Sequence, residues 1–324
     1  MGDRYERVAV LVPCLNEAAT VGKVVDDFRR ELPGATVWVY DNGSDDGTAD
    51  VAERHGAIVR HESRRGKGNV VRSMLREVDA DCYLLVDGDD TYPAEAAPAL
   101  VGPILSGEAD HVVGDRLSNG SYAAENGRAF HGLGNDLVRG LIRVLYGFGY
   151  ADVMTGYRAM SRPFAKTLPL LSPGFQVETE LSIWAVDRRW RTVEVPVDYR
   201  DRPEGSCSKL DTVRDGARVL RCIASLFRDF RPMPFFLGLT CLLTCCGLAL
   251  GVPVCIEFAR TGLVERLPTA ILACALCGLA AMMLSCGLVL DSCAKASRRA
   301  WEVEAMRAFE ESGRRWEGKT NEAA

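Results

Sequence analysis

The sequence has few of the features that mark several common protein classes. Only 4 of its 324 residues are His, so a zinc site built on imidazole ligands has little to draw on. The formal net charge is -5, which gives no basic surface for nucleic acid. No residue type dominates, which excludes a collagen, a mucin-like stalk or a wholly disordered chain. Charges at Asp3, Arg4 and Glu6 interrupt the apolar stretch that a signal peptide needs, so none is expected.

The 12 cysteines do not form the pattern of a disulfide framework or a metal site. Most of them lie in two apolar runs, where they are expected to pack as small side chains. Cys274 and Cys277 have CxxC spacing, but no second pair or histidine lies nearby in the sequence, so a redox or zinc role is not expected. The segment Arg64–Gly68 is rich in Gly and basic residues, yet it matches neither a P-loop nor a dinucleotide fingerprint.

Two runs without ionisable side chains, 235–256 and 267–290, predict transmembrane helices. At 1.5 Å per residue, about 20 residues cross a hydrocarbon core of roughly 30 Å. Buried core helices are the alternative, but such helices are seldom apolar over this length. More Lys and Arg residues flank the two runs on their outer sides than in the linker 257–266. The positive-inside rule therefore predicts a cell-membrane protein with two spans, with the N-terminal domain and both termini cytoplasmic.

The first 208 residues alternate between strand-like and helix-like segments. Alternation of this kind predicts an α/β layer with a largely parallel sheet. Ligands of such sheets bind beyond the carboxyl ends of the strands. The expected strands are 8–12, 36–40, one near Ile58 and 83–86, and the expected helices are 21–32, 49–55 and 69–78.

Polar clusters follow three of these strands. The first two, Pro13–Glu17 and Asp41–Thr48, contain the residue types of Asx turns, so a purely structural role is an alternative for each. The third, Asp87–Asp90, places three carboxylates in four residues, which repel one another unless a cation compensates them. Carboxylates together with phosphate oxygens suit Mg²⁺ or Mn²⁺. A solvated acidic turn is the alternative.

The ordered set of motifs resembles family 2 glycosyltransferases with the GT-A fold. The later motifs resemble the polyprenyl-phosphate branch of that family, the dolichol-phosphate mannosyltransferase-like enzymes, and the resemblance covers about residues 7–210. The motifs that carry it are Val12–Glu17, Asp41–Thr48, Arg65–Gly68, Asp87–Asp89, Gly114–Arg116, Asp152 with Thr155–Arg158, and Arg202 with Ser206, Ser208 and Lys209.

The resemblance implies a Rossmann-like GT-A domain that binds a nucleotide sugar, followed by a two-helix transmembrane hairpin. It implies that Asp87 and Asp89 form the DxD metal motif, with Asp89 the main ligand. Asn42 departs from the pattern, because many relatives carry a second Asp there. The remaining residues that it implies are Pro13, Asn16, Glu17 and Asp41 in the nucleotide pocket, Arg116 near the phosphates, and Arg202 and Lys209 in a basic segment associated with the phosphate groups in catalysis. From its own chemistry, Lys67 is a candidate to meet the diphosphate, and Asp152 is a further candidate for a catalytic role.

The acceptor is expected to be a lipid phosphate, which needs cations to hold it and no general base, because it is largely a dianion near pH 7. The cationic candidates are Arg158, Arg200, Arg202 and Lys209. A hydroxyl acceptor would need a base, and three carboxylates stay open for that role, Asp152, Glu178 and Glu180. Asp152 is expected to orient Arg158 or the acceptor.

The predicted organisation is a GT-A domain (1–208), an amphipathic helix in the membrane interface (209–234), the two spans (235–290) and a cytoplasmic tail (291–324) that serves oligomer contacts. The predicted function is metal-dependent, inverting transfer of a sugar from a UDP- or GDP-sugar to undecaprenyl or dolichyl phosphate. The alternative is a membrane glycosyltransferase that acts on a hydroxyl of a glycolipid or polysaccharide.

Overall fold

The computed structural model describes residues 5–118, 139–147, 151–200 and 212–322. The chain divides into two compact units. The first comprises residues 1–223 together with 303–324, and the second comprises residues 224–302. Each unit is described by itself below.

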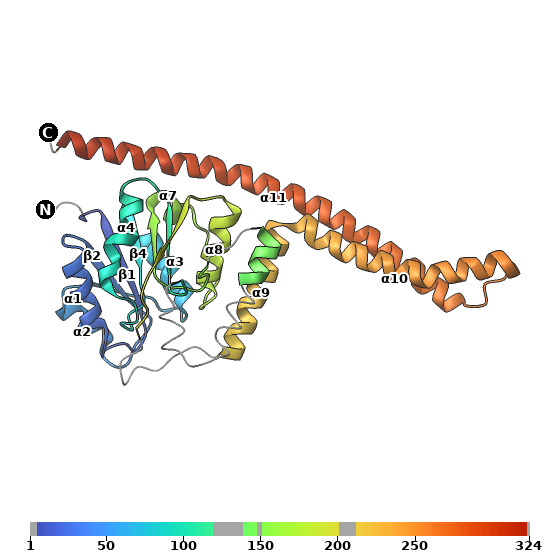
Figure 1. The fold of residues 1–324 in the computed structure, drawn as a ribbon, viewed down its shortest axis with the longest axis horizontal. Coiled ribbons are helices and arrows are strands. Elements are labelled where there is room, and N and C mark those ends of the chain that lie inside the picture. The colour runs from blue at the N-terminus through green and yellow to red at the C-terminus, as the bar shows by residue number, and fades with distance from the viewer. Residues whose placement is uncertain (1–4, 119–138, 148–150, 201–211, 323–324) are drawn as a thin grey trace. The chain divides into compact units, whose positions relative to one another are not determined.

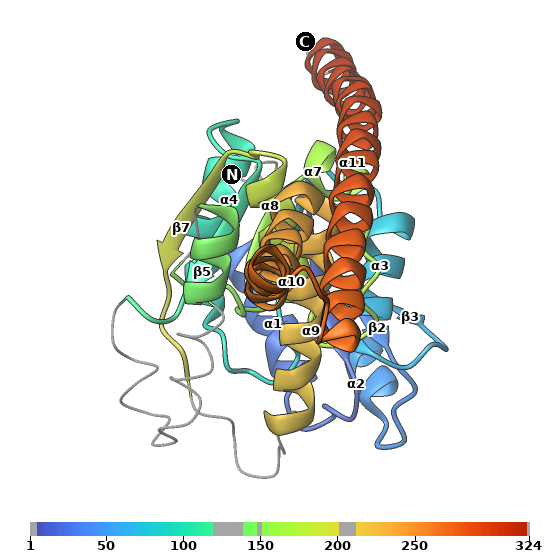
Figure 2. The same ribbon diagram turned by 90° about the vertical axis from the view of Figure 1, so that its right-hand side faces the viewer.

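The first unit is built on one mixed sheet of seven strands (Figure 1). The strand order is β3-β2-β1-β4-β6-β5-β7, with β7 and β5 near one edge and β3 at the other (Figure 2). All neighbouring pairs are parallel except those of β6, which runs antiparallel to both β4 and β5. The strands are β1 (Val8–Cys14), β2 (Thr36–Asp41), β3 (Ile58–His61), β4 (Cys82–Leu85), β5 (His111–Asp115), β6 (Arg158–Ser161) and β7 (Thr192–Pro196).

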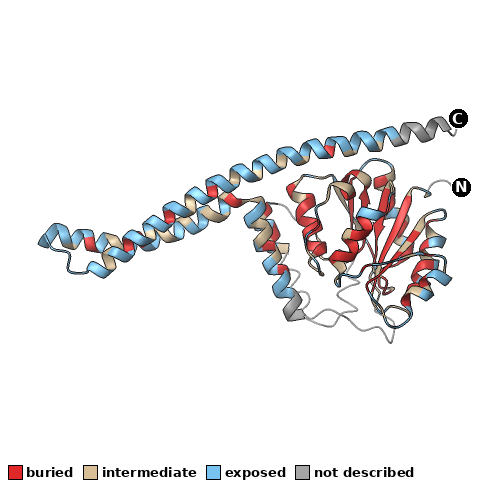
Figure 3. Ribbon diagram, turned by 180° about the vertical axis from the view of Figure 1, so that it is seen from behind, coloured by how far each residue is buried: buried red, intermediate tan, exposed pale blue. Residues whose placement is uncertain are grey.

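Helices cover both faces of this sheet, so that the central strands are buried (Figure 3). On one face α1, α2 and α4 enclose the main hydrophobic core with β1, β2 and β4. On the other face lie α3, α7 and α8. The bounds are α1 (Val21–Glu31), α2 (Thr48–Arg54), α3 (Lys67–Glu77), the short 3₁₀ helix η1 (Ala94–Ala96), α4 (Ala97–Leu105), α7 (Arg162–Thr167) and α8 (Val177–Asp187).

The α/β architecture predicted from the sequence is confirmed, and the first four strands and three helices lie close to their expected positions. Three further strands, β5, β6 and β7, were not assigned. Of these, β6 reverses direction within the otherwise parallel sheet. Short segments such as Arg158–Ser161 carry no periodicity long enough to distinguish a buried strand from a loop.

The second unit is a hairpin of two long apolar helices. Helix α10 spans Pro232–Thr261, and α11 begins at Leu267 and continues to Glu322. Both are long and apolar enough to cross a membrane by length and composition. Small residues let them pack closely, as where Gly247 lies against Cys277. The two predicted spans fall inside these helices, but α11 does not end with the second span.

Helix α9 (Thr212–Phe230) precedes the hairpin and lies within the predicted amphipathic segment. In its described part, Val219 and Ile223 are buried, and the Cys222 thiol lies 3.6 Å from the Ser172 hydroxyl. Leu220 is 38% exposed. The helix therefore buries one face, which carries Val219 and Ile223, and leaves Leu220 accessible.

Candidate active site

A pocket of about 250 Å³ opens where the carboxyl ends of β1, β2 and β4 meet. The sheet register explains why, since β1 pairs Cys14 with Asp41 of β2 and Leu11 with Leu85 of β4. The segments that follow these strands therefore converge at one edge of the sheet, as expected of a parallel α/β sheet. The polar side chains that line the pocket belong to Glu17, Asn42, Arg65, Lys67, Asp87 and Asp89.

Lys67, at the start of α3, joins two carboxylates of the site. Its ammonium forms ion pairs with Asp87 and, at 2.6 Å, with Glu178 Oε1. Burial by itself lowers the pKa of Lys67, but the two carboxylates outweigh it and raise the pKa above its ordinary value. Burial raises the pKa of Glu178, although Lys67 opposes that shift. The other Glu178 oxygen, Oε2, is buried and has no hydrogen-bond partner among the described residues.

Gly156 lies directly against the Asp87 carboxylate. A Cβ on Gly156 would lie 2.7 Å from Asp87 Oδ2, so a larger residue would displace that carboxylate. This contact brings the loop that precedes β6 against the DxD motif. The Thr155–Arg158 motif of the sequence therefore has a steric reason for its glycine.

Asp87 and Asp89 both line the pocket and supply the hard oxygen ligands that Mg²⁺ and Mn²⁺ prefer. Asp89 is 3% exposed, and its Oδ1 accepts a 2.7 Å hydrogen bond from the Thr91 hydroxyl. Among the described residues, no group of three or more His, Cys, Asp or Glu side chains could hold a metal ion. The residues fit a divalent ion that takes its remaining ligands from a diphosphate and water, and they do not fit an all-protein cage.

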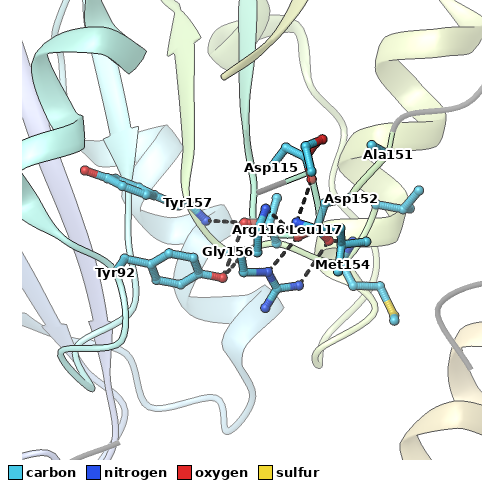
Figure 4. Close-up of polar contacts among 12 residues, drawn as sticks. Tyr92, Asp115, Arg116, Leu117, Ala151, Asp152, Met154, Gly156 and Tyr157 are labelled. Atoms are coloured by element: carbon cyan, nitrogen blue, oxygen red, sulfur yellow. Dashed lines mark hydrogen bonds and ion pairs between the residues drawn. The ribbon is translucent and has the colours of Figure 1, made fainter. Parts of the chain in front are cut away.

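Arg116 and Asp152 form a buried ion pair (Figure 4). The guanidinium donates to both carboxylate oxygens, at 2.6 and 3.0 Å, and also lies over the rings of Tyr92 and Tyr199. Burial lowers the pKa of Arg116, but Tyr92 and Asp152 raise it to a net value well above normal. Arg116 is therefore a fixed cation, and Asp152 is its counter-ion.

Two residues predicted for the nucleotide pocket are held in turns. Asp41 is 4% exposed, and its carboxylate accepts hydrogen bonds from the backbone N–H of Gly43 and of Ser44. Asn16 has a positive φ of 51° and accepts a 3.0 Å hydrogen bond from Asp45 N–H. The pocket lining includes neither of them, whereas it does include Pro13 and Glu17. Nucleotide binding by Asp41 and Asn16 stays a prediction.

Several predictions about the acceptor site change. Arg158 is fully buried, and its guanidinium donates to the carbonyls of Val153 and Thr155, so the prediction that it holds a phosphate is wrong. Asp152 pairs with Arg116, and its role in orienting Arg158 or the acceptor stays a prediction. Arg200 is accessible and pairs with Glu95 at 3.0 Å. The other two predicted phosphate ligands, Arg202 and Lys209, lie outside the described residues.

Sequence reasoning gave no role in the site to Phe175, which lines the pocket. Arg65, which the sequence singled out within a Gly-rich basic motif, lines the pocket too, and Glu178, an open candidate for a base, contacts Lys67. Asn42 also lines it, although the sequence marked this residue only as a departure from the family pattern. The position of Asn42 directly after a strand was the available signal.

Comparison with known proteins identifies the family. The model for Glycosyl transferase family 2 matches residues 9–168. Glycosyltransferase AglJ of Haloferax volcanii is 34% identical over 254 residues, which cover 78% of this chain and 82% of that protein. The chain belongs to glycosyl transferase family 2. Within this family, the dolichyl-phosphate hexose transferase of the same organism is 31% identical over 227 residues, which cover 70% of this chain and 96% of that protein.

Solved structures of similar proteins show the same GT-A fold. Glucosyl-3-phosphoglycerate synthase from Mycobacterium tuberculosis, in complex with Mn²⁺, UDP and glucosyl-3-phosphoglycerate, matches with a TM-score of 0.55 at 28% identity. The match covers 67% of this chain and 78% of that one. The same synthase bound to Mn²⁺, UDP-glucose and phosphoglyceric acid matches with a TM-score of 0.54. The chain is thus a glycosyltransferase with a GT-A-like mixed sheet followed by two long apolar helices.

Proposed function

We propose that this glycosyltransferase moves a hexose from a UDP- or GDP-sugar to a polyprenyl phosphate at the cytoplasmic face of the cell membrane. The observation that carries the proposal is the pocket in which Asp87 and Asp89 face Lys67 and Arg65. Carboxylates for a metal and cations for phosphates are what the departure of a nucleoside diphosphate requires. The similarity to UDP-glucose-bound synthase structures supports the donor class.

The acceptor is supported by a relative and by the membrane helices. Nearly the whole length of the dolichyl-phosphate hexose transferase aligns with this chain. Helices α10 and α11 would tether the domain to the bilayer in which a polyprenyl phosphate resides. We assign α9 to the membrane interface and Arg200, Arg202 and Lys209 to the acceptor phosphate. An acceptor of this kind needs cations and no base.

Each group in the pocket then has a defined task. Asp89, with Asp87, would hold Mg²⁺ or Mn²⁺, which supplies positive charge to the departing diphosphate when bound. Lys67 and Arg65 bind the diphosphate oxygens. Arg116, fixed by Asp152, adds positive potential at the same edge of the sheet. An oxygen of the acceptor phosphate attacks the sugar carbon C1 while the bond from C1 to the diphosphate oxygen breaks and the nucleoside diphosphate leaves. We propose that the configuration at C1 is inverted.

The test is transfer by the full chain in lipid nanodiscs. Labelled UDP- and GDP-sugars are offered with Mn²⁺ and a polyprenyl phosphate, and lipid-linked sugar is measured after extraction. We expect product with one donor and a loss of about 100-fold or more in Asp89→Asn, the effect typical of removing a charge-stabilising group.

Asp90→Asn is the matched control, because it makes the same chemical change one residue away. Asp90 has a positive φ of 58° and pairs with Lys23, a contact of small energy at the surface. Asn tolerates this backbone conformation, so activity should stay within about threefold. Absence of lipid-linked sugar with every donor, or full activity in Asp89→Asn, would contradict the proposal.

Glu178 favours a second candidate, transfer to a hydroxyl of a glycolipid or polysaccharide. It is a buried carboxylate beside the pocket, with a raised pKa and an oxygen that has no hydrogen-bond partner among the described residues. These are properties of a general base. The two candidates differ in whether Glu178 is essential.

A further inference from the structure

Asn42 makes an unusual number of contacts to one loop. Its side-chain nitrogen donates to the Glu62 carbonyl at 2.8 Å and to the Arg64 carbonyl at 2.9 Å. Its side-chain oxygen accepts a 2.7 Å hydrogen bond from the Gly66 N–H. The residue is 4% exposed, so these bonds are shielded from water. One amide thus holds three points of the segment 62–66, the loop between β3 and α3.

Only an amide of this size satisfies all three contacts. Two backbone carbonyls need donors and one N–H needs an acceptor, and an Asn side chain supplies both. A carboxylate at this position has no donor and would face two carbonyl oxygens. The same contacts fix the orientation of the amide. If it were flipped, its oxygen would face the two carbonyl oxygens and its NH₂ group would face the Gly66 N–H. Asn42 is therefore suited to this loop, where an Asp is not.

The loop has little freedom on its other side. Gly66 has φ +121°, and a Cβ there would lie 2.2 Å from the Pro173 carbonyl oxygen. Gly66 is therefore held on one side by its hydrogen bond to Asn42 and on the other by close contact with the Pro173 backbone. The residues on either side of Gly66 are Arg65 and Lys67, and both line the pocket.

We propose that Asn42 is a positioning residue that holds Arg65 and Lys67 where they meet the diphosphate of the donor. It acts through the loop backbone, and the cations make the contact with phosphate. The inference rests on the proposed function for its donor, a nucleoside diphosphate sugar, and it is independent of the acceptor. Loss of the Asn42 amide should therefore weaken the recognition of the second phosphate and leave the base and ribose contacts largely intact.

The experiment compares diphosphate with monophosphate binding. The full chain in nanodiscs is titrated calorimetrically with UDP, UMP, GDP and GMP in the presence of Mn²⁺. We expect the wild type to bind one diphosphate at least tenfold more tightly than its monophosphate. In Asn42→Asp this preference should fall to about threefold or less, while the monophosphate affinity changes by less than threefold. General destabilisation would weaken both ligands together and would leave the ratio unchanged.

Two further variants isolate the cause. Ala49→Asp adds the same charge in the first turn of α2, where an acidic residue is tolerated, and it should keep the wild-type preference. Asn42→Ser removes the amide without adding charge, and it should lose the preference as Asn42→Asp does. Asn42→Ser also replaces Asn42→Asp if the latter fails to fold.

The outcomes separate this inference from the proposed function. An unchanged diphosphate preference in Asn42→Ser overturns the positioning role and leaves the proposed function intact. A wild type that binds neither UDP nor GDP overturns both the positioning role and the proposed function. In a third outcome, the wild type prefers the diphosphate, substitution of Asn42 removes that preference, and no sugar is transferred to polyprenyl phosphate. This result supports the positioning role and overturns the proposed acceptor.

Discussion

At the scale of single residues, the three carboxylates that the sequence left open as bases occupy different settings. Asp152 is fully buried and accepts both hydrogen bonds of the Arg116 fork. Glu180 accepts from the backbone N–H groups of Leu171 and Ser172. Glu178 shares Lys67 with Asp87 and keeps one oxygen without a partner among the described residues. Of the three, Glu178 has the setting that a base requires.

Glu178→Gln therefore separates the two acceptor classes. A polyprenyl phosphate needs no base, so we expect the transfer rate to fall by about tenfold or less, whereas loss of a general base costs about 10² to 10⁴. The rate should decline below pH about 6 as the acceptor phosphate gains its second proton. That decline should be the same in wild type and variant, measured as kcat against pH.

The opposite result identifies a base. Because burial raises the pKa of Glu178, a catalytic Glu178 would lose activity as the pH falls through that raised value and the carboxylate gains a proton. Glu178→Gln would then remove both the activity and this acidic limb of the profile. If the transfer rate of Glu178→Gln falls more than 100-fold and its pH profile has no acidic limb, the acceptor is a hydroxyl and not a phosphate.

At the scale of elements, the segment between β3 and α3 has an electrostatic anchor in Glu62. Its carboxylate accepts from the side chain and N–H of Arg64 and from the Ser73 hydroxyl. Arg64 is the main cause that lowers the pKa of Glu62 from 4.5 to about 2, against the effect of burial. The folded state thus favours the ionised form, and this contribution to stability is present above pH 4.5 and is lost as the pH falls toward 2.

Glu62→Gln should lower the free energy of unfolding of this domain by about 1 to 3 kcal/mol at pH 7, the cost of losing hydrogen bonds to a charged group. The difference from wild type should shrink by roughly half at pH 3, because the unfolded wild type is then protonated at Glu62 while the folded form, with its pKa of about 2, is still mostly ionised. Thermal unfolding followed by tryptophan fluorescence measures it. Glu53→Gln, on an exposed position of α2, is the control and should show no such dependence on pH. An equal destabilisation at both pH values would contradict the assigned role.

The elements that the sequence predicted best are those with strong periodicity. Helix α1 and strands β1 and β2 lie near their expected bounds, because alternating or continuous apolar runs define them. The position of Asp87 just beyond a strand was also predicted, whereas its contact with Lys67 was not. Arg158 was misassigned, because a charged side chain in a short segment gives no sign that the fold will bury it among carbonyl groups. The contacts of Asn42 depend on a loop geometry that one sequence does not encode in any local pattern.

At the scale of the whole molecule, the second unit gives the positive-inside argument a structural basis. The Arg298 guanidinium of α11 donates to the Phe230 carbonyl, directly before α10, at 2.7 Å. The outer ends of both helices therefore lie together, with Arg298 beside the residues that precede α10. At the other end, the linker holds Arg266, which pairs with Glu257. This end has the weaker positive charge and is expected to face away from the cytoplasm.

The length of α11 adds a second expectation about topology. At 1.5 Å per residue, its 56 residues extend for about 84 Å, far more than the roughly 30 Å of a hydrocarbon core. The apolar part ends near residue 290, and the polar remainder must stay in water on the side that the helix reaches. We expect that side to be the cytoplasm, which it shares with the glycosyltransferase domain.

Reporter fusions test this arrangement in intact cells. Alkaline phosphatase, which is active only outside the cytoplasm, should be active when inserted in the linker between Thr261 and Leu267. It should be inactive when fused after Phe230 or after Ala324, and green fluorescent protein should give the reverse pattern at all three points. The fusion after Phe230 is the internal control, because it reports the side of the catalytic domain without either span. Phosphatase activity after Ala324 together with inactivity after Phe230 would mean that the chain crosses the membrane an odd number of times. In that case the hydrogen bond between Arg298 and the Phe230 carbonyl could not form in the membrane, and the two-helix hairpin would be wrong.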